Sequence, residues 1–328
     1  METRKVQLAG NSTYTISLPK AWAEEQGLET GMPLGLRPRD GRLILETDHD
    51  AAAPAPVVDV TDASTAELRD VVYGLYALGY DEFGVQVDGG LPPAVRRSVS
   101  ALASELAGLE VQSEDATTVR CRDLLDPSEL SVPRVVSRLR FAALSAHRRA
   151  TGALVEGATG DGVDAADRVE DHRRDAAAEA ALVERYFQRT LTDVADLDRL
   201  GTGRAELVDQ LRVAEELERV ASLAVDVART ADEDPLPGRP AGSFTDHAER
   251  TRRSIEGATE VALSDASRAA ALDAQAESRR CAEAVRSLAD GDVDAGAWSL
   301  AVGTLARTAD CGAAIGTHAL RSALRREA

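Results

Sequence analysis

The stretch SVPRVVSRLRFAALSAHRRATGAL, residues 131–154, begins a pattern that continues to the end of the chain. Ser131 is placed to cap a helix, with Pro133 in its first turn. Apolar residues then recur three or four positions apart on one helix face: Val136, Leu139, Ala143, Ala146, Ala150 and Leu154. The stretch predicts a long amphipathic helix and a mainly α C-terminal half.

The same helical period returns five more times after this stretch. We expect these further helices over 163–194, from 204 to about 232, and over 245–263, 265–289 and 295–326. A Pro/Gly-rich break over 232–243 separates the first three helices from the last three. This arrangement indicates an internal repeat, with one three-helix bundle over 131–232 and a second over 243–328.

Residues 57–126 alternate strand and helix signals in the order β-α-β-α-β-β. Ser64 to Glu67 has the sequence of a capping box, and Gly79 is placed to end the helix that follows. No glycine-rich phosphate loop follows a strand. We therefore expect a small sensory or packing α/β domain, joined to the N-terminal part by an Ala/Pro linker over 48–56.

Residues 1–47 predict four short strands in two hairpins around one helical turn. Pro19 and Lys20 open that turn, and Gly27 closes it. So few elements cannot bury much surface alone, so a partner chain is expected.

Charge separates this N-terminal part from the rest of the chain. The chain has a formal net charge of -18, which repels nucleic acid unless a locally basic surface exists. Residues 1–47 hold equal numbers of basic and acidic residues, including both lysines, Lys5 and Lys20. Acidic composition with scarce lysine is typical of a salt-rich cytoplasm, and a coding bias towards arginine explains it equally well.

Several classes of protein find no support in the sequence. Three scattered cysteines predict neither a disulfide framework nor a metal knuckle. No apolar run reaches membrane-spanning length, so we expect a cytoplasmic protein without membrane insertion. No nucleophile-elbow, zinc-protease or Walker pattern occurs, so we do not expect an enzyme. His147, His172, His247 and His318 are expected to have surface or packing roles.

The run RKVQLAGNSTYTISLPKAWAEEQGLETGMPLGLRPRDGRLIL, residues 4–45, resembles the AbrB/MazE/SpoVT family of DNA-binding domains. The matching segments are 15–20, 27–31 and 40–44, whereas Pro33 departs from the acidic residue usual at its turn. The resemblance implies a swapped-hairpin β-barrel module, formed by a homodimer through residues 1–47, that binds DNA.

The resemblance also implies which residues contact DNA. These are Arg4, Lys5, Asn11, Ser12, Thr13, Lys20, Arg37, Arg39 and Arg42. The alternative is that the arginines only balance neighbouring Glu2, Glu24 and Asp40.

The helical half resembles the PhoU family of phosphate-signalling proteins, which are tandem three-helix bundles. The resemblance depends on AEELERVA at 214–221 and on LARTAD at 305–310, followed by Ala314 to Gly316. The joint order of modules is similar to archaeal PhoU-type regulators, and the acidic composition fits a halophilic member. A phosphate-transporter ATPase or a signalling partner is implied.

PhoU-type bundles hold metal through carboxylates four residues apart on one helix face. Here Glu218 is followed four residues later by Ser222, and one alignment of the preceding helix places Arg173 and Ala177 at the carboxylate positions. A shift of two residues offers Asp171 and Asp175 instead. A divalent or ferric metal at Asp171, Asp175 and Glu218 stands against the alternative of a solvated acidic face.

The sequence thus supports a dimeric, DNA-binding transcriptional or signalling regulator of phosphate uptake and phosphate homeostasis. The alternative is a protein-interaction adaptor of a phosphate transporter, whose N-terminal module serves only dimerisation. An antitoxin-like role for that module is a third possibility. Salt-dependent retention on DNA separates the first hypothesis from the second.

Overall fold

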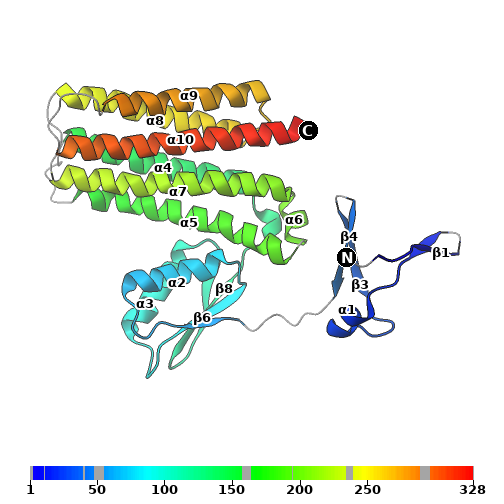
Figure 1. The fold of residues 1–328 in the computed structure, drawn as a ribbon. Helices are drawn as coiled ribbons and strands as arrows, with labels where there is room; N and C mark the ends of the chain where they lie inside the picture. Colours follow the sequence, from blue (N-terminus) through cyan, green and yellow to red (C-terminus); the bar gives the residue numbers. More distant parts are fainter. Residues whose placement is uncertain are drawn as a thin grey trace. The chain divides into compact units, whose positions relative to one another are not determined.

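The structure is a computed structural model that divides the chain into two compact units, 1–54 and 55–328. Figure 1 shows the helices and strands of both units. The residues that the structure describes are 3–10, 12–39, 41–47, 55–156, 164–193, 195–233, 239–288 and 296–327.

Unit 1 contains two antiparallel hairpins and one short helix. Its elements are β1 (Gln7–Ala9), β2 (Thr13–Thr15), α1 (Lys20–Glu25), β3 (Leu34–Arg39) and β4 (Arg42–Thr47). β1 pairs with β2, and β3 pairs with β4. The predicted hairpins and helical turn are confirmed. The sequence favours a strand over 13–18, whereas β2 ends at Thr15, which pairs with Gln7, the first residue of β1.

The N-terminal part of unit 2 has the predicted β-α-β-α-β-β order. Its elements are β5 (Val57–Asp59), α2 (Thr65–Ala77), β6 (Glu82–Gln86), α3 (Pro93–Glu105), β7 (Leu109–Glu114) and β8 (Thr118–Asp123). The four strands form one sheet in the order β5-β6-β8-β7. β5 and β6 are parallel because α2 connects them as a crossover, and the other pairs are antiparallel.

Both ends of α2 follow from its sequence. The Ser64 hydroxyl accepts a hydrogen bond from the Glu67 N–H at 3.2 Å, and the Glu67 carboxylate accepts one from the Ser64 N–H at 2.8 Å. Gly79 follows the helix with a φ of 88°. A Cβ there would lie 2.9 Å from Cγ of Arg189, so a larger residue would also meet the neighbouring helix α5 (Ala165–Thr192).

The rest of unit 2 is helical, as predicted, and its helices form two sets of three. The helices are α4 (Val132–Glu156), α5 (Ala165–Thr192), α6 (Ala195–Leu200), α7 (Arg204–Glu233), α8 (Arg239–Ala262), α9 (Arg268–Ser287) and α10 (Ala297–Glu327). α4, α5 and α7 pack together, as do α8, α9 and α10 (Figure 1). The two sets meet through α7 against α10 and α4 against α8.

Two helical features differ from the sequence expectation. α8 begins at Arg239, six residues before the expected start. The helix can include Pro240 because residues in the first turn make no intrahelical bond through their N–H groups, so the N–H that proline lacks is not missed there. The short helix α6 was not expected. The Asp193 carboxylate accepts a hydrogen bond from the Ala195 N–H at 2.7 Å and so helps to start it.

Small side chains set the spacing inside the helical part. A Cβ at Gly316 on α10 would lie 2.9 Å from Cα of Gln275 on α9, so these two helices approach backbone to backbone. One hydrophobic cluster extends from the α/β region into the first helical set, and includes Val72, Val136 and Tyr186. The α/β region therefore shares its core with the helices instead of standing apart from them.

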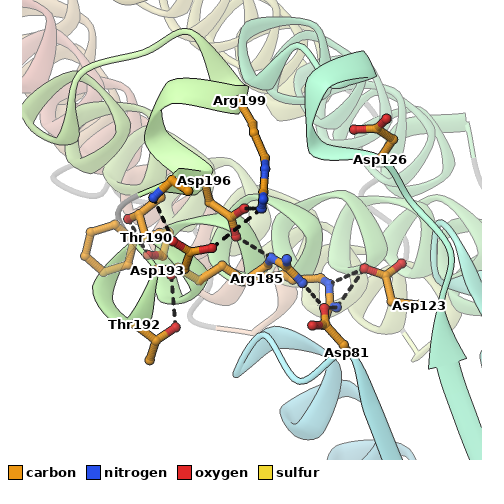
Figure 2. Close-up of polar contacts among 12 residues, drawn as sticks. Asp81, Asp123, Asp126, Arg185, Thr190, Thr192, Asp193, Asp196 and Arg199 are labelled. Carbon is orange, nitrogen blue, oxygen red and sulfur yellow. Dashed lines mark hydrogen bonds and ion pairs between the residues drawn. The ribbon is translucent and has the colours of Figure 1, made fainter. Parts of the chain in front are cut away.

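A buried ion network joins the α/β region to α5 (Figure 2). The Arg185 side chain is 0% exposed, and its Nη2 lies 2.7 Å from Oδ2 of Asp123, which is 3% exposed. Arg185 Nη1 also donates to the backbone oxygen of Tyr76 at 2.8 Å. One turn later, Arg189 pairs with Asp81 and with the buried Asp196. The network fixes α5 against both the sheet and α6.

Candidate nucleic-acid interface

The first group of predicted DNA contacts lies around the β1–β2 hairpin. Arg4 and Lys5 are exposed and precede β1, from which Val6 separates them. Ser12 and Thr13 are exposed where the chain enters β2, after Gly10 turns the backbone with a φ of 68°. Asn11 lies outside the described residues.

Lys20 begins α1 and is highly exposed. Its Nζ lies 3.4 Å from Oε1 of Glu24, one helical turn later. An ion pair between two exposed side chains contributes little, about 0–1 kcal/mol. The Glu24 contact therefore leaves the Lys20 ammonium available to another anion.

The remaining predicted contacts lie on the β3–β4 hairpin. Arg37 is half-buried, Arg42 is exposed, and Gly41 turns the backbone between the strands with a φ of 71°. Arg39 and Arg42 are register partners across the ladder. Within one copy of unit 1 the predicted residues thus lie on three local elements.

The apolar residues of both hairpins are uncovered. On the first hairpin, the exposed fractions of Val6, Leu8, Tyr14 and Ile16 are 63%, 60%, 76% and 53%, respectively. On the second hairpin Leu36 is 59% exposed and Leu43 is 55% exposed. Of the unit 1 side chains whose burial the structure describes, none is buried. Contiguous apolar surface of this kind marks an interaction site, since burying each such side chain gains about 1.5–3 kcal/mol.

The candidate metal ligands lie in unit 2. The Asp171 and Asp175 side chains on α5 are 81% and 71% exposed, and they lie near Arg174 and His172 respectively. Glu218 lies on α7, where burial raises the pKa of its carboxyl group against the opposing effect of nearby Arg173. Among the described residues, no three His, Cys, Asp or Glu side chains converge as a metal site would require. A metal at these positions stays a prediction.

One cluster was not foreseen from the sequence. Arg148 and Arg149 on α4 line a cavity together with Arg252 on α8. The sequence shows that Arg148 and Arg149 are adjacent, but Arg252 lies more than a hundred positions further along the chain. Next to it, His147 is fully buried.

The comparisons with known proteins reach the N-terminal unit alone. The family model described as "Antidote-toxin recognition MazE, bacterial antitoxin" matches residues 7–51, which include both hairpins and α1. No curated protein and no solved structure matches the chain. In the described part of the chain, none of the helices combines the length and apolar character needed to cross a membrane.

Proposed function

We propose that the protein is a cytoplasmic, homodimeric DNA-binding regulator of phosphate uptake and phosphate homeostasis that acts without catalysis. The proposal is carried by one combination of observations. A MazE-like sequence lies in a unit whose apolar hairpin faces are uncovered and whose cationic residues surround them. Unit 2 would carry the part that receives the signal.

Dimerisation is the first step of this proposal. Neither hairpin of unit 1 buries its apolar residues within one chain, and a single hairpin is marginally stable in water. A second copy would cover Leu8 and Tyr14 on one hairpin and Leu36 and Leu43 on the other. A swapped-hairpin barrel of two chains satisfies this requirement, and its two-fold symmetry suits a two-fold DNA site.

DNA contact is the second step. The net charge of -18 belongs to the chain outside residues 1–47, which are neutral overall. Two copies of Arg4, Lys5 and the β3–β4 arginines would provide a locally basic surface on an otherwise acidic molecule. Phosphate contacts of this kind supply most of the salt-dependent affinity for DNA.

The link to phosphate depends on the helical half. The PhoU-like segments 214–221 and 305–316 lie on α7 and α10, each of which is the last helix of its three-helix set. This equivalence supports an internal repeat of PhoU type. A transporter ATPase or a signalling partner would act on this half.

Antitoxin activity is a second candidate, favoured by the printed description of the matching family. In that case a toxin would bind the chain, and DNA binding would serve autoregulation. The third candidate, a transporter adaptor, requires unit 1 for dimerisation alone.

The deciding experiment is genome-wide DNA occupancy of the tagged full chain in phosphate-rich and phosphate-starved cells. We expect discrete peaks near phosphate-transport genes that vanish in Arg4→Ala/Lys5→Ala. A matched control, Arg279→Gln/Arg280→Gln, removes an exposed adjacent pair from α9 and should keep the peaks. Fragments recovered from the peaks should bind with a salt dependence that weakens by about one unit of slope per lost phosphate contact. Absence of peaks in both conditions would overturn the proposal and favour the adaptor.

A further inference from the structure

A cavity of about 430 Å³ opens between α4, α5 and α8 in unit 2. Its volume falls within the range of small-molecule sites, about 300–1,000 Å³. Part of its wall is apolar, formed by residues such as Ala153, Val155 and Val169. The rest of the wall is dominated by arginine.

Four arginines and one carboxylate line this cavity. The arginines are Arg148, Arg149, Arg168 and Arg252, and the carboxylate is that of Glu156. Elsewhere in unit 2 arginines pair with acidic side chains, as Arg138 does with Glu179 at 2.6 Å. In the ranges that the structure describes, Arg148, Arg149 and Arg252 have no carboxylate within ion-pair distance. A chain of net charge -18 thus keeps a locally cationic hollow.

Neutral groups hold Arg252 in place. Its Nη1 donates to Oγ1 of Thr151 at 3.1 Å and to Nδ1 of His147 at 3.4 Å. A guanidinium can only donate, so Nδ1 of His147 is the acceptor in this contact, which assigns the imidazole proton to Nε2, a buried atom with no hydrogen-bond partner among the described residues. Burial, together with the charge of Arg252, lowers the pKa of His147 to about 3, so the ring stays neutral. These contacts orient the Arg252 guanidinium without neutralising it.

The orientation leaves Arg252 with donors to spare. Its Nε and Nη2 have no hydrogen-bond partner among the described residues. Burial and the nearby charge of Arg148 lower the pKa of Arg252, against the smaller opposing effect of the Glu249 carboxylate. The start of α5 does not supply this site, because the Asp232 carboxylate already accepts from the N–H groups of Ala165 and Ala166 at 2.7 and 3.0 Å.

We propose that this cavity binds the phosphoryl group of a small anionic metabolite through Arg148, Arg149 and Arg252. A phosphate ester carries about two negative charges at pH 7 and three strong acceptor oxygens, which guanidinium forks match. The apolar wall and the volume leave room for an organic group attached to the phosphate. Inorganic phosphate has the same chemistry, so the test separates the free ion from its esters.

This site is independent of DNA binding by unit 1, since every residue that forms it belongs to unit 2. Failure of either proposal therefore leaves the other intact. The Arg4→Ala/Lys5→Ala variant serves as a direct check, because it removes predicted DNA contacts and should keep metabolite binding.

The test is calorimetric titration of the full chain with AMP, ATP and inorganic phosphate, with sulfate for comparison. Arg252→Gln and Arg148→Gln/Arg149→Gln should each weaken binding by about tenfold or more, because a hydrogen bond to a charged group is lost. Arg252→Lys keeps the charge but loses the planar fork, so it should recover only part of the affinity. Circular dichroism confirms that each variant is folded.

Arg279→Gln/Arg280→Gln on α9 is the matched control and should bind as the wild type does. Preference for AMP or ATP over inorganic phosphate would identify an ester as the ligand, and equal affinity would identify the free ion. The proposal is overturned if the wild type binds none of the three at millimolar concentration. It is also overturned if the α9 control weakens binding as much as Arg148→Gln/Arg149→Gln, because the attraction would then be nonspecific.

Discussion

Unit 1 and unit 2 differ in how far their apolar side chains are buried. Unit 2 buries its apolar residues within one chain, in two clusters that include Val136 and Leu154. Unit 1 leaves Leu8 and Tyr14 largely exposed, and none of the side chains whose burial is described there is buried. The contrast follows from size, because fewer than sixty residues in short hairpins cannot enclose a core. The incomplete unit is also the one that matches the family model of the MazE antitoxin.

The largest effect is expected on association. Leu8→Asp/Tyr14→Asp places two charges on a cross-strand pair that a second copy would cover. The dimer Kd should rise by at least about 1,000-fold, since apolar burial is lost and charge is trapped in both copies. Sedimentation velocity over a range of concentrations measures this.

The matched control is Leu300→Asp/Leu324→Asp, which alters residues 61% and 45% exposed on α10. It should leave the oligomeric state unchanged. A double hairpin variant that still dimerises as the wild type does would break the comparison, because unit 1 would then not depend on these faces.

The second effect concerns the buried ion network that joins the α/β region of unit 2 to α5. Arg185→Ala leaves Asp123 buried without its cationic partner, which should lower the free energy of unfolding by about 3–5 kcal/mol. Urea unfolding followed by circular dichroism measures the change. Arg138→Ala removes a more exposed pair with Glu179 and should cost about 0–1 kcal/mol. Equal losses from the two variants would contradict the role assigned to the buried network.

A third effect depends on pH. The pKa of His147 is about 3 in the folded chain, below its ordinary value of 6.5. Between these values the unfolded chain takes up a proton that the folded chain does not, so stability is complete above pH 6.5 and falls as pH decreases. The contribution is about 1.4 kcal/mol per pH unit. His147→Asn should remove this contribution, so the free energy of unfolding should change less steeply with pH between pH 4 and about 6. An unchanged slope would show that His147 is protonated in the folded chain.

The smallest effect tests whether the α/β region belongs to the same cooperative body as the helices. Ser64→Ala removes the cap of α2 and should cost about 1 kcal/mol. Because this region shares its core with α4 and α5, the loss should shift the single unfolding transition of unit 2. Ser104→Ala alters an exposed serine inside α3 and should change little. A separate early transition in Ser64→Ala would show that the α/β region unfolds independently.

Local signals in the sequence predicted most of the fold. The Ser64–Glu67 cap, the stop at Gly79 and the helical periods each depend on neighbouring residues, and the structure confirms them. Helix α6 was missed because six residues are too few to show a period.

Contacts between residues far apart in the sequence could not be predicted. The Arg185–Asp123 pair joins residues 62 positions apart, and Arg252 meets His147 across 105 positions. In the N-terminal unit the need for a partner followed from the few short strands, whereas the faces that it would cover required the exposed fractions of Leu36 and Leu43. The sequence shows the two adjacent arginines at 148–149, but it does not show the cavity that they line.

The uncovered hairpin faces have a genetic consequence. A chain that carries Arg4→Ala/Lys5→Ala still presents Val6, Leu8, Tyr14 and Ile16, which those substitutions do not touch. Co-expressed with the natural chain, it would pair with it and draw intact copies into defective heterodimers. Such an allele should therefore be dominant, whereas an allele that disrupts the faces themselves should be recessive.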